Sequence, residues 1–114
     1  MSLNALTSGM RKPKRERDNF LIVLSEDAAR DLDDVWDYLA REESVNAADT
    51  VLREIAKTYK LLGAWPLLGR KRDNLSPGAR SLPVNPYVIF YRITEDVVRI
   101  VRMLHQSRDT DLVF

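Results

Sequence analysis

The chain contains no cysteine and a single histidine, His105, among its 114 residues. Disulfide bonds, thiol nucleophiles and metal sites made of histidine and cysteine are therefore excluded, and we expect neither a metal nor another cofactor. Stability must come from side-chain packing. Hydrophobic residues make up 45% of the chain, which supplies one core, while the length is too short for two. We expect a single domain.

Long hydrophobic runs are also missing. No stretch of 18 apolar residues occurs, and the first twenty positions are polar and basic. A membrane-spanning helix needs about 20 apolar residues, and a secretory signal needs an apolar centre of roughly 7–15. Because neither pattern is present, we expect a cytoplasmic protein.

Charge is separated along the chain, although the formal net charge is only +1. Residues 25–62 hold ten acids against five bases, whereas residues 70–108 hold eight arginines and lysines against three acids. Residues 11–17 add five bases against one acid. This separation favours an anionic partner for the last third of the chain, either nucleic acid or an acidic protein segment.

Hydrophobic periodicity predicts a strand followed by two helices. Residues 20–24 are uninterrupted apolar positions, too few for a helix and typical of a strand covered on both faces. Ser25 then stands at an N-cap position, and the apolar residues after it fall on one helical stripe, namely Ala28, Leu32, Val35, Trp36 and Leu39. The pattern makes Trp36 a core residue. A second helix is predicted from an Asn46 N-cap to Gly63, which we expect as the residue after its end.

Residues 65–69 show no hydrophobic periodicity and contain a proline, so we expect a loop whose tryptophan and leucines cover the core. A basic loop follows at 70–72. Three strand-like runs follow at 79–84, 87–93 and 97–104, separated by short turns. We therefore expect an α+β fold of order β-α-α-β-β-β. The last three strands form an antiparallel meander, the first strand joins it through a crossover, and the helix hairpin covers one face. Residues 1–19 form a basic extension that packs on another copy or on a sheet edge, 20–109 the domain, and 110–114 a tail.

Five short patterns occur in one order between residues 20 and 109. They are Ala28-x-x-Asp31-Leu32-x-x-Val35-x-x-Tyr38, Leu62-x-x-x-Pro66-x-x-Gly69, Gly78-x-Arg80, Tyr87-x-Ile89-x-Tyr91, and the ending Arg102-Met103-Leu104-His105-Gln106-Ser107-Arg108-Asp109. Together they resemble the toxins of the RelE/ParE superfamily, from bacterial type II toxin–antitoxin (plasmid stabilization) systems, and lie nearer the ParE branch.

The resemblance implies a cognate antitoxin that neutralises the toxin, and it leaves two mechanisms open. ParE-like members inhibit DNA gyrase and so stop replication, whereas RelE-like members cleave mRNA on the ribosome without a metal. A third possibility is a non-toxic remnant that acts as a binding or regulatory partner of its antitoxin.

Cleavage of RNA without a metal needs an acid, a base and cations around the phosphate. The resemblance suggests Arg80, Arg102 and His105 for these roles. No carboxylate lies on the meander strands to act as the base, which argues against a nuclease. Histidine at a strand end is also more often a packing residue, and Asp31 fits a solvated helix face.

Partner binding is the other role open to the basic third of the chain. We expect an acidic antitoxin tail or the cellular target to contact apolar anchors and surrounding bases. The candidates are Trp65, Leu67, Leu68, Arg70, Lys71, Arg72, Arg80, Tyr91, Arg102 and Arg108. Arginines suit this role because their paired N–H donors match carboxylates and phosphates.

Overall fold

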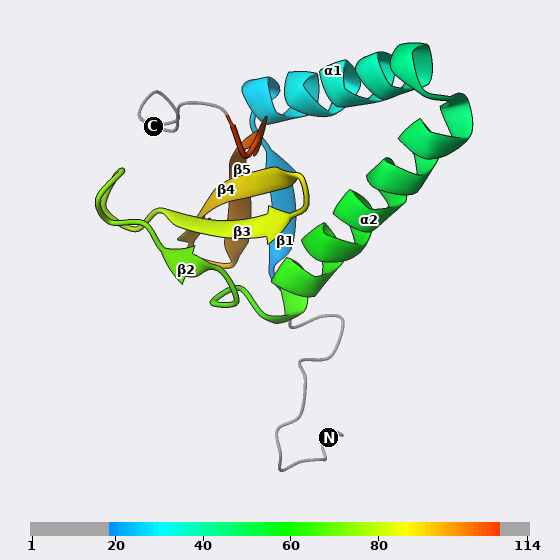
Figure 1. Cartoon of the computed structure of the whole chain (residues 1–114). Coiled ribbons are helices and arrows are strands. Elements are labelled where there is room, and N and C mark those ends of the chain that lie inside the picture. The colour runs from blue at the N-terminus through cyan, green and yellow to red at the C-terminus, as the bar shows by residue number, and fades with distance from the viewer. Residues whose placement is uncertain (1–18, 108–114) are drawn as a thin grey trace, which may run out of the picture.

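The computed structural model describes residues 19–107, and its elements follow the expected order with one addition (Figure 1). They are β1 (Leu21–Leu24), α1 (Glu26–Glu42), α2 (Val45–Ala64), β2 (Arg70–Lys71), β3 (Arg80–Val84), β4 (Tyr87–Thr94) and β5 (Val97–His105). The interpretations of the extension before Asn19, of Arg108 and of the tail lie outside the described residues.

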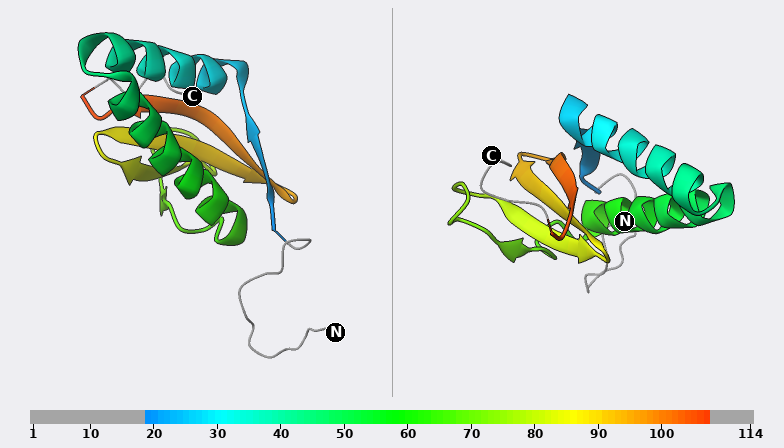
Figure 2. Two further views of the ribbon diagram at one scale, coloured as in Figure 1. Left: turned by 90° about the vertical axis from the view of Figure 1, so that its right-hand side faces the viewer. Right: turned by 45° about the horizontal axis from the view of Figure 1, so that its top comes forward.

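The strands form one five-stranded sheet in the order β1-β5-β4-β3-β2. Strand β1 runs parallel to β5, and the other neighbours are antiparallel. The expected α+β fold is therefore confirmed, with a C-terminal meander and a first strand added by a crossover through the helices. Both helices lie on one face of the sheet and diverge from their short connection (Figure 2).

The sequence predicts one helix start correctly and misplaces the other. The Ser25 hydroxyl oxygen accepts a hydrogen bond from the Ala28 N–H at 2.9 Å, so Ser25 is the expected N-cap. Helix α2 begins at Val45, before the expected Asn46, because Ser44 has an extended backbone and its Oγ accepts from the Ala47 N–H at 3.0 Å.

The end of α2 also differs from the prediction. The helix continues through Gly63 to Ala64, and Trp65 is its C-cap. Gly63 is needed for a different reason, since a β-carbon there would lie 3.1 Å from the Phe20 carbonyl oxygen. The Phe20 N–H donates to the Gly63 carbonyl at 2.9 Å, which joins the start of β1 to α2.

The main core lies between the helices and the sheet. Its buried members are Ala28, Ile55, Leu62, Tyr87, Ile89, Tyr91, Val98, Ile100 and Met103. Trp36, predicted as core, does not belong to it. That side chain is half-buried between the helices and its indole N–H donates to Asp49 at 3.0 Å, which satisfies the polar end of the ring.

Strand β1 is covered on one face only, so the expectation of a doubly buried strand is wrong. Ile22 and Leu24 pack on the main core, whereas Leu21 on the opposite face is 67% exposed. The sheet also has one strand more than expected, because Arg70 and Lys71 pair with β3. A strand of two charged residues has no hydrophobic period that could identify it.

Candidate functional site

An exposed apolar surface follows the end of α2. Trp65, Leu67 and Leu68 are all exposed, with Leu67 at 67%, and Leu61 on the last turns of α2 is also exposed. We expected these side chains to cover the core, but they point to solvent instead. Exposed apolar side chains grouped in this way form a candidate interaction surface.

Two side chains of the sheet hold this loop from beneath. The Tyr91 hydroxyl donates to the Pro66 carbonyl and accepts from the Gly69 N–H, both at 2.8 Å. Arg80 Nη1 donates to the Gly69 carbonyl at 2.6 Å and to the Leu67 carbonyl at 3.3 Å. Tyr91 is fully buried, which raises the pKa of its hydroxyl. Both residues were candidates for partner contact, but here they position the loop.

Basic side chains border the apolar loop. Arg70 and Lys71 are exposed, whereas Arg72 is half-buried, with its guanidinium 5.8 Å from the centre of the Phe90 ring. Arg72 also donates to the Ser81 hydroxyl at 3.2 Å. Arg70, Arg72 and Leu68 line a shallow hollow of about 420 Å³. We call Trp65, Leu67, Leu68, Arg70, Lys71 and Arg72 the loop surface.

Arg102 lies on β5 and forms an ion pair with a residue of α1. Its Nε and Nη2 donate to the two carboxylate oxygens of Asp31 at 2.8 and 2.9 Å. Asp31 also accepts the Met103 N–H at 2.9 Å. The expectation that Asp31 belongs to a solvated helix face is therefore wrong, since its side chain is only 12% exposed. The ion pair and the removal of Arg102 from water have opposite effects on the pKa of Arg102, and the Asp31 contact prevails and raises it.

The position of Asp31 follows from the length of β1. That strand pairs with β5 only as far as Ile100, so the rest of the β5 edge has no neighbouring strand. Ser25 donates from its backbone N–H to the Ile100 carbonyl at 3.0 Å, and from its hydroxyl to the Val101 carbonyl at 2.8 Å. Farther along the same edge, the Asp31 carboxylate accepts the Met103 N–H. The start of α1 thus replaces a missing strand.

The three nuclease candidates lie on two strands, Arg80 on β3 and Arg102 with His105 on β5. Arg80 is bonded to the loop after α2, and Arg102 to α1. His105 Nδ1 lies 2.9 Å from the Ser107 hydroxyl, and its ring meets the Tyr87 ring edge-on at 5.7 Å. Each candidate therefore has its own structural partners. Within residues 19–107, no group of three or more histidine, aspartate or glutamate side chains is placed to hold a metal ion.

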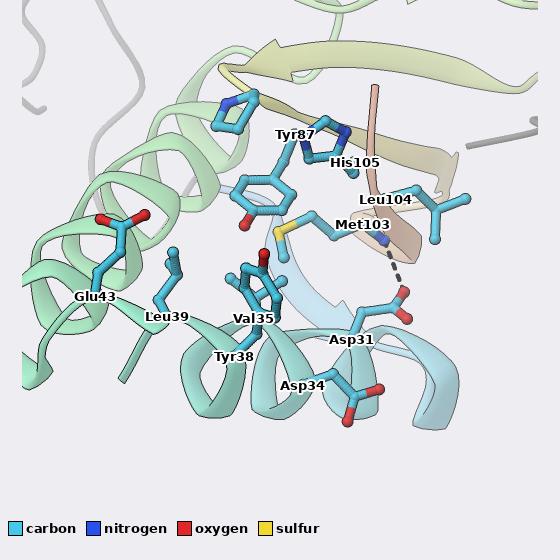
Figure 3. A pocket seen from close by; sticks show the side chains of 11 residues that line it. Asp31, Asp34, Val35, Tyr38, Leu39, Glu43, Tyr87, Met103, Leu104 and His105 are labelled. Carbon is cyan, nitrogen blue, oxygen red and sulfur yellow. Dashed lines mark hydrogen bonds between the residues drawn. The ribbon is translucent and has the colours of Figure 1, made fainter. Parts of the chain in front are cut away.

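A second hollow, of about 530 Å³, lies between α1 and the ends of β4 and β5 (Figure 3). We call it the helix cleft. The side chains that line it include Asp31, Asp34, Tyr38, Glu43, Tyr87 and His105. Burial raises the pKa of Tyr87, and the nearby Tyr38 and Glu43 raise it further. The sequence did not identify this cleft, because its walls come from three separate segments.

The fold is that of the RelE/ParE toxins. A chain of the chromosomal ParDE system from P. aeruginosa superposes with a TM-score of 0.67 and 22% identity, over 77% of this chain and 97% of that one. A chain of the RelBE2 toxin–antitoxin complex from Mycobacterium tuberculosis superposes with a TM-score of 0.54 and 22% identity, over 76% and 98%. At these identities the similarity establishes the fold alone.

Sequence comparison gives the family. Residues 22–110 match the family described as ParE toxin of type II toxin-antitoxin system, parDE. Toxin ParE1 of Mycobacterium tuberculosis is 36% identical over 90 residues, which cover 78% of this chain and 92% of the relative. Toxin ParE1 of Caulobacter vibrioides is 37% identical over 84 residues, 74% and 86% of the two chains. This chain belongs to the ParE family of type II toxins. Among the described residues no helix is long and apolar enough to cross a membrane.

Proposed function

We propose that this toxin stops growth by inhibiting DNA gyrase, without a reaction of its own, and that a cognate antitoxin neutralises it. The main support for this mechanism is that Arg80 and Arg102 already make hydrogen bonds within the protein, Arg80 to the loop and Arg102 to Asp31. A ribonuclease needs such cations free to surround the phosphate in the transition state. Family membership supports the same choice.

Growth measurements in bacteria test this proposal. Induction of the chain alone should stop growth, and DNA synthesis should fall before protein synthesis, because inhibited gyrase blocks replication first. Incorporation of labelled thymidine and labelled methionine after induction measures both. Protein synthesis falling first would favour the mRNA endonuclease. Unchanged growth with verified folded protein would favour the non-toxic remnant.

The antitoxin is proposed to bind the loop surface through a segment with apolar anchors and carboxylates. Apolar side chains and bases stand next to each other there, and Arg70 and Lys71 are exposed at the rim. Exposed ion pairs contribute only about 0–1 kcal/mol each, so the affinity should depend mainly on the apolar anchors. The bases should mainly set the association rate and its dependence on salt.

Trp65→Ala is expected to weaken antitoxin binding by about ten- to a hundredfold at any salt concentration, because it removes a large apolar anchor. Arg70→Ala combined with Lys71→Ala should slow association and reduce its salt dependence. Binding kinetics at low and high salt measure both effects. Val45→Ala, an exposed apolar residue at the other end of α2, is the matched control and should change neither. An unchanged affinity for Trp65→Ala would place the antitoxin elsewhere.

A further inference from the structure

We propose that the helix cleft binds an arginine or lysine side chain of a partner protein. The cleft lies at the start of β4, where Tyr87 is the first residue, whereas the loop surface is supported by Tyr91, four residues farther along the strand. The proposal does not rest on gyrase as the target. The helix cleft would be a second docking point, for a cationic side chain that the basic loop surface would repel.

The hydroxyl of a largely buried tyrosine opens into the cleft. Tyr87 is 7% exposed and its ring packs in the main core. Within residues 19–107, its hydroxyl makes no hydrogen bond, and Figure 3 shows it directed toward the hydroxyl of Tyr38 on α1. Tyr91 packs in the same core and is fully buried, and its hydroxyl makes two hydrogen bonds to the loop. Since no group among residues 19–107 occupies it, the Tyr87 hydroxyl can accept a hydrogen bond from a ligand in the cleft.

Aromatic rings form two walls of the cleft. Tyr87 and His105 stand edge to face, with interplanar angle 86°, and Tyr38 reaches the same space from α1 (Figure 3). Tyr38 is a large side chain left mostly exposed on a helix whose other exposed residues are chiefly charged. Faces of tyrosine rings attract guanidinium and ammonium groups.

Acidic groups favour a positively charged ligand in the cleft. Among the described residues that line the cleft, three carry a carboxylate and only His105 carries a basic side chain. Arg102 neutralises Asp31. Asp34 and Glu43 form no ion pair within residues 19–107, so the cleft keeps a surplus of negative charge. A phosphate or carboxylate would meet repulsion there, whereas a guanidinium could donate to Glu43 and to the Tyr87 hydroxyl together.

The test is a nuclear magnetic resonance titration of the whole chain with Nα-acetyl-arginine methylamide, which carries the guanidinium and has blocked ends. Saturable shifts are expected at Tyr38, Tyr87 and His105. The citrulline analogue, which has the same shape and no charge, should bind at least about fivefold more weakly, since a charge-assisted contact is lost.

Two conservative variants assign the binding to the cleft. Glu43→Gln and Tyr87→Phe should each weaken the arginine derivative about three- to fivefold, because each removes one polar contact and leaves the fold intact. Tyr59→Phe is the matched control, since it deletes an unpartnered tyrosine hydroxyl that does not line the cleft, and it should leave the affinity unchanged. Equal binding of citrulline, shifts outside the cleft, no saturable shift, or equal effects of Tyr59→Phe and Tyr87→Phe would each overturn the proposal.

Discussion

Gly69→Ala should lower the free energy of unfolding by about 3 kcal/mol, as expected when atoms are forced into a packed site. A β-carbon at this position would lie 2.6 Å from the Tyr91 hydroxyl oxygen and 2.7 Å from the Ser81 carbonyl oxygen. Neither atom can retreat easily, since one belongs to a fully buried ring and the other to the backbone of β3. The loop must therefore move away from the sheet and lose its bonds to Tyr91 and Arg80. Urea denaturation measures the change.

Leu68→Ala in the same loop is the control for Gly69→Ala. Leu68 is exposed, so its truncation should alter the unfolding free energy by less than about 0.5 kcal/mol. Because Gly69→Ala displaces the loop, it should also weaken antitoxin binding. A loss of stability below about 1 kcal/mol would mean that the loop is less tightly held than the contacts of Gly69 indicate.

Asp31→Asn is expected to destabilise the protein by about 2–3 kcal/mol, since hydrogen bonds to charged groups are the strong ones. The substitution keeps the shape of the side chain but leaves the guanidinium of Arg102, which is 26% exposed, without its counter-charge. It also weakens the acceptor for the Met103 N–H at the open edge of β5. Thermal and urea unfolding would show the loss.

Asp34→Asn provides the comparison for Asp31→Asn, because Asp34 is an exposed acid on the same helix. We expect an effect within about 0.5 kcal/mol. Arg102→Ala combined with Asp31→Ala should cost less than the sum of the two single changes, because each single change leaves a charge unpaired. Strict additivity in this double-mutant cycle would contradict a direct interaction.

Local patterns in the sequence predicted most of the fold. The Ser25 cap and the apolar runs of β4 and β5 depend on neighbours within a few residues, so they can be recognised without the tertiary structure. The predicted strands at 87–93 and 97–104 end within a residue of the observed ones. Two-residue β2 was missed because its pairing with β3, rather than its own residues, makes it a strand.

The site was predicted less well, because its contacts join distant residues. Asp31 and Arg102 are 71 positions apart, and no local rule pairs them. One signal was available, since Asp31 stands between Ala28 and Leu32 on the apolar side of α1, where an acid needs a partner. Trp65, Leu67 and Leu68 were expected both to cover the core and to contact a partner, and their exposure contradicts the first expectation. Tyr91 was expected at the surface but is buried, because burial of a single tyrosine depends on the loop that covers it.

The loop surface and the helix cleft carry charge of opposite sign. Basic residues of the loop surface adjoin an apolar loop, whereas acids of α1 adjoin the helix cleft. We propose an antitoxin segment with carboxylates as the ligand of the loop surface and a cationic side chain as the ligand of the helix cleft. Because the two surfaces share no lining residue, variants of one should leave binding at the other unchanged.

Purified gyrase, relaxed plasmid and this chain provide the most direct test of the proposed mechanism. The account predicts that the toxin inhibits supercoiling or leaves gyrase-dependent breaks in the plasmid, that His105→Ala retains the effect, and that the antitoxin abolishes it. The parallel reaction contains ribosomes and a defined mRNA. Normal gyrase activity, together with mRNA cleavage on ribosomes that His105→Ala abolishes, would contradict the account.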